Sequence, residues 1–293
     1  MSAWNDATVD VRGGVVAAQS LGAHGPAVVL LGGATWSRDW WPEGFCRALV
    51  DAGLRVIRFD PRDTGGSTLS PPGTPEYDAE DMAADVVAVL DAFQVGSATV
   101  VGLSAGGGIA QEVAGWHPSR VAGLVLMSTT AGGDIGVDLP GPADALATTF
   151  AHPPADPDWS DRGAVVDGVV ESERPYAGPG MFDEAEVRRL AGVVWDRTPS
   201  MASGSNHFVI AEASPALSMD ALRGVRALII HGTADPLFPV AHGEALAEYL
   251  RAPLLTLDGV GHQIPPASMW PEVVQAIAEV AAVDQYVRPL RTR

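Results

Sequence analysis

Short, continuous apolar runs alternate with amphipathic segments along much of the chain. Runs that are apolar throughout predict strands buried on both faces of a mainly parallel sheet, and apolar residues at helical spacing predict helices packed against it. The expected strands are an opening hairpin at 9–21 and runs at 27–31, 55–59, 98–103, 121–128, 227–230 and 253–257. The expected helices are 43–52, 78–93, 105–116, 183–195, 240–250 and 271–283. This alternation predicts an α/β fold with a doubly wound, mostly parallel sheet.

The alternation stops between about residues 131 and 220, where prolines are frequent and no strong strand pattern occurs. A structureless loop of that length is unusual inside a compact domain, so we expect a small, mostly helical insertion. The chain is therefore expected to have a first core part at 1–130, a helical cap at 131–220 and a second core part at 221–293.

Composition narrows the possible partners. Hydrophobic residues make up 47% of the chain and charged residues 18%, which is ample for a large core. The net charge of −18 argues against binding to nucleic acid or to an anionic membrane surface. The single cysteine, Cys46, excludes an intrachain disulfide and a cysteine-based zinc site, and we expect it to pack inside helix 43–52.

The first residues lack the basic and apolar regions of a secretory signal, and no apolar run is long enough to span a membrane. We therefore expect a cytoplasmic protein that needs neither a cofactor nor a metal, and the sequence leaves its oligomeric state open.

Ser104 lies between the predicted strand 98–103 and the predicted helix 105–116, with Gly102 and Gly106 two residues to either side. Gly-x-Ser-x-Gly between a strand and a helix is the nucleophile-elbow pattern, because side chains at the glycine positions would collide across so sharp a turn. A glycine-rich loop that happens to contain a serine is the alternative. A phosphate-binding loop fits less well, since no Lys-Ser/Thr pair follows the glycines.

Asp235 and His262 also follow predicted strands. Residues beyond the carboxyl ends of parallel strands gather at one sheet edge, and the order Ser, Asp, His is that of an α/β-hydrolase triad. A serine hydroxyl needs an imidazole to take its proton and a carboxylate to orient that imidazole. Asp235 alternatively forms a turn or a helix cap, and Asp134 competes for the role of acid.

The other histidines considered are weaker candidates than His262. His231 ends a buried strand and is expected to be structural, His242 and His117 lie on or beside outer helices, and His207 belongs to the insertion, where it could touch substrate.

Gly33 follows the strand 27–31, and Ala105 opens the helix after Ser104. Their backbone N–H groups are candidates for an oxyanion hole, which stabilises the negative charge that develops on an attacked carbonyl. An ordinary tight turn at Gly32-Gly33 is the alternative for the first of them. Candidate substrate contacts are the aromatic residues Trp36, Phe208 and Phe238.

The sequence resembles the serine α/β-hydrolases and, more narrowly, actinobacterial polyketide-tailoring methylesterases of the aclacinomycin methylesterase type. The matching stretches are Leu31-Gly-Gly33, Arg55 to Ser67 with its Asp-Pro-Arg-Asp-Thr-Gly turn, Asp81 to Phe93, Val100 to Gly106, Ala234-Asp235-Pro236 and Gly259-Val-Gly-His262. The inserted segment matches poorly, and Ala105 stands where such enzymes usually have methionine.

This resemblance implies that Ser104 is the nucleophile, His262 the general base and then acid, and Asp235 its orienting partner, with oxyanion donors at Gly33 and Ala105. It further implies a helical lid over a largely apolar pocket and the removal of a small alkyl ester from a bulky aromatic substrate. The remaining alternatives are carbon–carbon bond hydrolysis, lactone opening or a lyase reaction on the same triad, and a hydrolase-fold protein that binds a ligand without turnover.

Overall fold

The computed structural model describes residues 3–213 and 216–282. Across these residues, eight strands form one sheet in the order β1-β2-β4-β3-β5-β6-β7-β8. β1 and β2 form an antiparallel hairpin, β2 pairs antiparallel with β4, and all other neighbours pair in parallel. The predicted mostly parallel α/β sheet is therefore confirmed. The strands are Asn5–Val11, Gly14–Leu21, Ala27–Leu31, Arg55–Phe59, Ala98–Leu103, Val121–Met127, Ala227–Gly232 and Leu254–Leu257, numbered β1 to β8 in that order.

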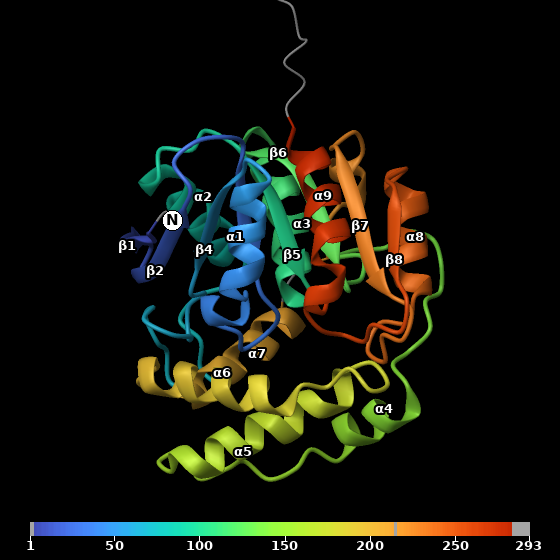
Figure 1. Ribbon diagram of the computed structural model, residues 1–293. Helices are drawn as coiled ribbons and strands as arrows, with labels where there is room; N and C mark the ends of the chain where they lie inside the picture. The colour runs from blue at the N-terminus through green and yellow to red at the C-terminus, as the bar shows by residue number, and fades with distance from the viewer. Residues whose placement is uncertain (1–2, 214–215, 283–293) are drawn as a thin grey trace, which may run out of the picture.

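Helices cover both faces of the sheet (Figure 1). α1 (Glu43–Asp51) and α9 (Trp270–Ala281) lie on one face, and α2 (Ala79–Ala92), α3 (Ala105–Trp116) and α8 (Ala241–Leu250) lie on the other. The position of β3 in the sheet explains why its sequence is apolar throughout. Successive residues point to opposite faces, and all of them are buried, Val29 in the core under α2 and α3 and Val28 in the core under α1 and α9.

The helix α2 begins where its acidic first turn predicts. Asp78 caps the helix by accepting a hydrogen bond from the Asp81 N–H at 2.9 Å, and the Asp81 carboxylate accepts one from the Asp78 N–H at 3.2 Å. This reciprocal capping box is typically worth about 1 kcal/mol. Cys46 is buried in α1, as expected. The predicted end of the last helix at residue 283 lies outside the described residues.

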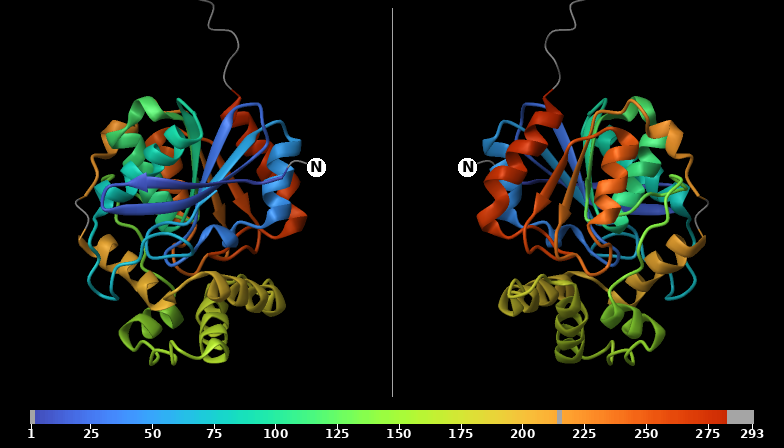
Figure 2. Two further views of the ribbon diagram at one scale, coloured as in Figure 1. Left: turned by 90° about the vertical axis from the view of Figure 1, so that its left-hand side faces the viewer. Right: turned by 90° about the vertical axis from the view of Figure 1, so that its right-hand side faces the viewer.

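The described residues between β6 and β7 contain four α-helices: α4 (Asp144–Ala151), α5 (Arg162–Glu173), α6 (Glu184–Arg197) and α7 (Asn206–Ala213). We refer to α4, α5 and α6 as the cap. Figures 1 and 2 show the cap beyond the end of the sheet to which the carboxyl ends of the parallel strands point. The cap therefore covers the edge at which ligands bind in folds of this kind.

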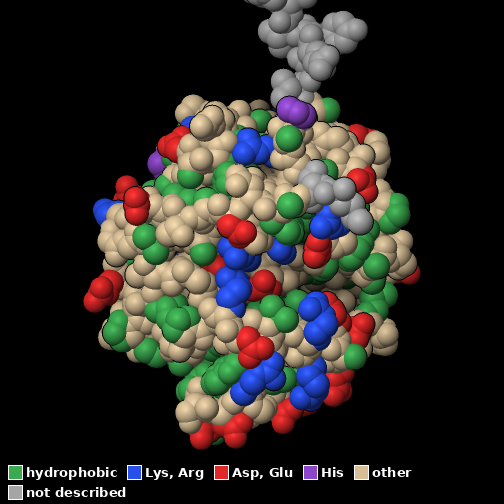
Figure 3. Space-filling view, turned by 60° about the vertical axis from the view of Figure 1, so that its left-hand side comes forward, with side chains coloured by type: hydrophobic (Ala, Val, Ile, Leu, Met, Phe, Trp, Pro, Cys, Tyr) green, Lys and Arg blue, Asp and Glu red, His purple; other side chains and the backbone are tan. Residues whose placement is uncertain are grey.

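Much of the outer surface of the cap is charged. Figure 3 shows acidic and basic side chains side by side on its lower part, and α5 and α6 are joined there by Arg162–Asp196 at 2.8 Å and Arg188–Asp167 at 2.5 Å. Such exposed pairs typically contribute less than about 1 kcal/mol each. The two helices are therefore held together mainly by their buried apolar residues, among them Val166, Val170 and Leu190.

The turn after β4 anchors the cap to the sheet. Asp60, which is fully buried, accepts hydrogen bonds from Arg197 at the end of α6 at 2.5 and 2.7 Å, and Asp39 shares the same guanidinium. Burial acts to lower the pKa of Arg197, but the hydrogen bonds and charges of the two aspartates raise it overall. Arg62 in the same turn forms a buried bidentate pair with Asp85 of α2 at 2.7 and 2.8 Å. Asp60 and Arg62 of the unusual Asp-Pro-Arg-Asp sequence are thus both paired with opposite charges in the interior.

Among the described residues, no helix combines the length and the apolar composition needed to cross a membrane.

Candidate active site

Ser104 occupies the turn between β5 and α3 with φ 55° and ψ −121°. A positive φ at a residue other than glycine costs about 1–3 kcal/mol, so the surroundings must hold it in place. A Cβ at Gly102 would lie 2.1 Å from the carbonyl oxygen of Gly106, and one at Gly106 would lie 2.5 Å from the carbonyl oxygen of Leu31. Both glycines are therefore required by close backbone packing, as the elbow pattern predicts.

A chain of hydrogen bonds joins three side chains that lie far apart in the sequence. The Oγ of Ser104 is 2.7 Å from Nε2 of His262, and Nδ1 of His262 is 2.9 Å from Oδ2 of Asp235. Asp235 follows β7 and His262 follows β8, so neighbouring parallel strands bring them to one edge. This geometry suits transfer of the serine proton to the imidazole, with the carboxylate fixing the imidazole tautomer.

Asp235 is held as a charged acceptor although it is buried. Burial acts to raise its pKa, but the hydrogen bond and charge of His262, together with the Phe238 N–H, outweigh that effect and lower the pKa below its ordinary value. Its second oxygen, Oδ1, accepts hydrogen bonds from the N–H groups of Leu237 and Phe238, both at 2.9 Å. These contacts fix the carboxylate in the orientation that faces His262.

Aromatic side chains and the segment after α5 cover His262. The ring of Phe238 meets the imidazole edge-on with centroids 5.5 Å apart, and the ring of Tyr176 lies 5.8 Å away. The backbone N–H of His262 also donates a hydrogen bond to the carbonyl oxygen of Tyr176 at 2.7 Å. The imidazole is therefore shielded from bulk water, which strengthens its electrostatic interactions.

The competing residues have other hydrogen-bond partners. Asp134 is exposed and accepts a hydrogen bond from the Gly136 N–H at 2.7 Å. His231 is fully buried, its Nε2 lies 2.7 Å from the carbonyl oxygen of Phe238, and burial lowers its pKa, which keeps it neutral. His242 contacts Thr130 and Pro140 beside α8. Asp235 is thus the carboxylate that the structure pairs with His262.

The backbone N–H groups of Gly33 and Ala105 are available to a ligand. A Cβ at Gly33 would lie 3.8 Å from the Cβ of Ser104, and Ala105 is the first residue of α3. Within the described part of the chain, neither N–H donates to a protein acceptor. Two backbone donors without a protein acceptor therefore lie close to Ser104 in space or in sequence, and the amino end of α3 adds a favourable dipole.

His207 supports the loop that carries Gly33. Its Nδ1 accepts a hydrogen bond from the N–H of Thr35 at 2.9 Å, and its Nε2 donates to the carbonyl oxygen of Arg62 at 2.7 Å. Both ring nitrogens have partners only in the neutral form, and burial lowers the pKa of His207 accordingly. Both ring nitrogens of His207 thus contact the core, which no local sequence pattern indicates.

A cavity of about 490 Å³ lies between the cap and the edge of the sheet. Phe208 is among its lining residues, as are Thr35 and Trp40 from the loop after β3. Trp36 and Phe238 lie nearby rather than in this lining. Trp36 stacks on Trp40 with centroids 4.6 Å apart. The cavity lining also includes Glu173, the last residue of α5, for which no sequence pattern indicates a place in the site.

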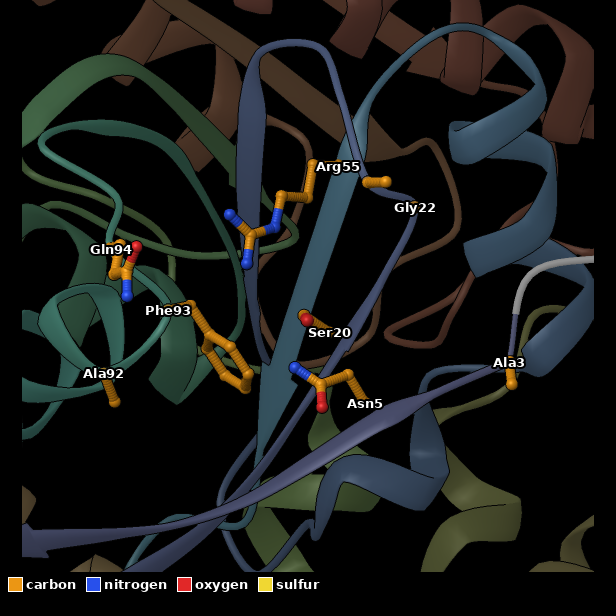
Figure 4. A pocket seen from close by; sticks show the side chains of 9 residues that line it. Ala3, Asn5, Ser20, Gly22, Arg55, Ala92, Phe93 and Gln94 are labelled. Carbon is orange, nitrogen blue, oxygen red and sulfur yellow. The ribbon is translucent and has the colours of Figure 1, made fainter.

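A second hollow of about 520 Å³ lies on another part of the protein, and Figure 4 shows the side chains of Asn5, Arg55 and Phe93 around it. Arg55 begins β4, so this hollow lies toward the amino end of that strand, whereas Ser104, Asp235 and His262 follow the carboxyl ends of theirs. The second hollow is therefore separate from the candidate active site.

In the residues that the structure describes, no group of three or more His, Cys, Asp or Glu side chains is arranged to hold a metal ion.

Residues 26–265 match the family model described as the α/β hydrolase fold. Rhodomycin D methylesterase of Streptomyces peucetius is 30% identical over 262 residues, which cover 82% of this chain and 86% of that protein. The solved structure of Est816, described as an N-acyl homoserine lactone degrading enzyme, matches with a TM-score of 0.65 and 26% identity over 92% of this chain and 99% of that one. A meta-cleavage product hydrolase of Pseudomonas fluorescens has the same fold, with a TM-score of 0.69 and 21% identity. The match covers 94% of this chain and 96% of that one. The resemblance seen in the sequence motifs is confirmed, and the chain belongs to the α/β-hydrolase fold family.

Proposed function

We propose that this protein is a cofactor-independent serine hydrolase that cleaves carboxylic esters. The observation that carries the proposal is the hydrogen-bonded series Ser104, His262 and Asp235 at the edge of the sheet that the cap covers. The similarity to rhodomycin D methylesterase supports an ester as the substrate.

In the proposed reaction, Nε2 of His262 takes the proton of Ser104 as Oγ attacks the carbonyl carbon of the ester. The tetrahedral intermediate places its oxyanion on the N–H groups of Gly33 and Ala105, and one such donor typically contributes about 3 kcal/mol to lowering the barrier. The intermediate collapses to an acyl-enzyme as the imidazolium gives its proton to the departing alcohol. Water then attacks the acyl group with His262 as base, and the acid is released.

For the substrate, we propose a methyl or other small alkyl ester of a bulky, largely apolar compound, in line with the similarity to the methylesterase. The cavity of about 490 Å³ falls in the range of small-molecule sites. In this proposal, residues 131–220 act as the cap domain that sets specificity. Phe208 contacts the substrate from within the cavity lining, and Trp36 and Phe238 contact it near the reacting carbonyl.

Lactone opening is a second candidate, because the likeness to Est816 extends over nearly the whole chain. A lactone is a cyclic ester, so the same residues would take the same roles. Product analysis on a matched methyl ester and lactone distinguishes the two. Similar rates of methanol release and ring opening would indicate a general esterase, whereas ring opening alone would favour the lactonase.

The proposal is tested with Ser104→Ala, using purified protein and p-nitrophenyl acetate. We expect kcat to fall by about 10⁴-fold or more, with only residual catalysis from the remaining site. Reaction with a fluorophosphonate should label Ser104 in the wild-type protein and leave the variant unlabelled. Full turnover by Ser104→Ala contradicts the proposal, and tight ligand binding without labelling of the wild type would indicate a binding protein instead.

A further inference from the structure

Glu173 places a carboxyl group inside the cavity beneath the cap. Its Oε1 accepts a hydrogen bond from Nε1 of Trp36 at 3.1 Å. The residue is partly buried and belongs to the lining of the cavity. Among the described residues that line this cavity, none is Lys, Arg or His. The carboxyl group therefore has a neutral donor on one oxygen and no basic side chain within its pocket.

The other acidic residues of the lining have partners or lie in solvent. Asp63 accepts hydrogen bonds from the Tyr77 hydroxyl at 2.7 Å and from the Asn206 amide at 2.8 Å. Glu171 is exposed and pairs with Arg174 at 3.0 Å, and Asp156 is exposed at the rim. Among these acidic residues, only Glu173 is partly buried and has an oxygen, Oε2, to which no described residue donates.

Leaving a carboxylate in such surroundings is unfavourable unless a ligand supplies the missing partner. Burial raises the pKa of Glu173, an effect that the Trp36 hydrogen bond and the nearby His262 reduce. A cationic group of the ligand would satisfy Oε2 and favour the charged form further. The net charge of the chain, −18, attracts cations and repels anions over a longer range.

Glu173 lies close to the proposed reaction centre. The ring of Trp36, which holds Oε1, is 3.5 Å from the position of a Cβ on Gly33, and that position is 3.8 Å from the Cβ of Ser104. Three residues after Glu173, the Tyr176 ring lies 5.8 Å from the imidazole of His262. Through Trp36 and Tyr176, the part of the cavity that Glu173 lines is therefore close to Ser104 and His262.

We propose that Glu173 is a specificity-determining residue that selects esters carrying a protonated amine, whose ammonium group donates a hydrogen bond to Oε2 in the cavity. That the ligand is an ester rests on the proposed function. Selection of the cation depends only on binding in the cavity, and it is testable without turnover.

The first measurement is therefore the affinity of ligands for the Ser104→Ala protein, determined by titration calorimetry. The ligands are two pairs of near-isosteric esters that differ in charge. Methyl 4-(aminomethyl)benzoate and methyl 4-ethylbenzoate place the difference on the acyl side, and 2-(dimethylamino)ethyl benzoate and 3-methylbutyl benzoate place it on the alcohol side. In at least one pair, we expect the ammonium ester to bind about tenfold or more tightly than the neutral one, the size typical of a hydrogen bond between charged groups.

The second measurement repeats the binding in Ser104→Ala combined with Glu173→Gln. Glutamine keeps the shape and still accepts the Trp36 hydrogen bond, but it carries no charge. We expect the preference for the ammonium ester to fall by about tenfold. The control is Asp167→Asn, which removes the same charge from the outer face of α5, where Asp167 pairs with Arg188. Thermal unfolding checks that each variant is folded.

The proposal is wrong if the neutral ester of both pairs binds as tightly as its ammonium counterpart, or if Glu173→Gln leaves the preference unchanged. It is also wrong if Asp167→Asn lowers the preference as much as Glu173→Gln, since the effect is then general electrostatics. Selective binding together with no hydrolysis by the wild type would overturn the proposed function and leave the role of Glu173 intact. The same pairs then give the ratio of kcat/KM values in the wild-type and Glu173→Gln enzymes.

Discussion

The sheet and the cap are built in different ways, although both contribute to the candidate active site. Every residue of β5 is buried, and its two neighbours in the sheet fix its register through parallel pairing. In α4, by contrast, only Leu146 is buried, and α5 and α6 carry exposed ion pairs on their outer surface. The proposed reacting side chains, Ser104, Asp235 and His262, follow strands of the sheet. The groups that line the cavity belong largely to the region with fewer buried contacts, where substitutions change the pocket without disturbing the sheet.

Polar contacts also connect the core to the inserted segment between β6 and β7. Arg197 at the end of α6 binds Asp60 and Asp39, and His207 in α7 holds the loop that follows β3 through Thr35. The division of roles between sheet and cap is therefore not complete, because the inserted segment also supports a loop that carries a proposed oxyanion donor.

The largest expected effect tests the role of the sheet edge. Asp235→Asn leaves the shape of the side chain but removes the acceptor that orients His262, and we expect kcat to fall by about 10⁴-fold. The measurement is turnover of p-nitrophenyl acetate by variants with unchanged thermal stability. Asp134→Asn is the matched control, since its carboxylate bonds only locally to Gly136 N–H and its rate should stay within about twofold. A larger loss in the control would indicate that the acid has been assigned wrongly.

The next effect concerns the contact between cap and sheet. Arg197→Met removes the nearer of the two cations beside buried Asp60 and leaves only Arg38, at 4.0 Å. We expect the free energy of unfolding to fall by about 3 kcal/mol, because breaking a buried pair leaves a poorly compensated charge. Urea denaturation measures the change. Arg162→Met removes an exposed pair with Asp196 and should cost less than about 1 kcal/mol. Equal losses in the two variants would mean that the Arg197 cluster does not anchor the cap.

A smaller effect is expected at the loop after β3. His207→Leu removes the acceptor of the Thr35 N–H, and we expect kcat to fall by about tenfold with little change in KM, since only transition-state stabilisation by the oxyanion donor is weakened. His207→Gln offers both an acceptor and a donor and should restore most of the rate. If Leu and Gln variants of equal stability turn over alike, His207 has no positioning role.

The smallest effect is the dependence of stability on pH. The pKa of buried His207 is lowered in the folded protein, so the unfolded chain binds more protons below its ordinary pKa of about 6.5. Stability is therefore lost as the pH falls from about 6.5 toward the lowered folded pKa, by at most about 1.4 kcal/mol per pH unit from this residue. Urea denaturation at pH values between about 7 and 5, around the ordinary pKa of histidine, gives the free energy of unfolding at each pH. The slope of this free energy against pH should be smaller for His207→Gln than for the wild type. An identical slope would show that His207 does not contribute.

Particular residues show how far the sequence was informative. The continuous apolar runs predicted β3 and β5 almost to the residue, because burial on both faces leaves no polar position to blur the pattern. The predicted helix 183–195 starts one residue later and extends to Arg197, whose role at the end of α6 depends on Asp60, far away in the chain. The sequence could not indicate that His207 contacts Thr35 and Arg62, since these contacts span more than a hundred residues.

By itself, the sequence determined the sheet, the elbow at Ser104 and the candidates Asp235 and His262. Local patterns suffice for these, because glycines mark the turn and residues that follow parallel strands must share one edge. Only the tertiary structure placed Glu173 in the cavity near His262, His207 behind the loop after β3 and Arg197 on Asp60. These contacts join polar residues of the inserted segment to distant parts of the core, and such pairs leave no periodic signal in the chain.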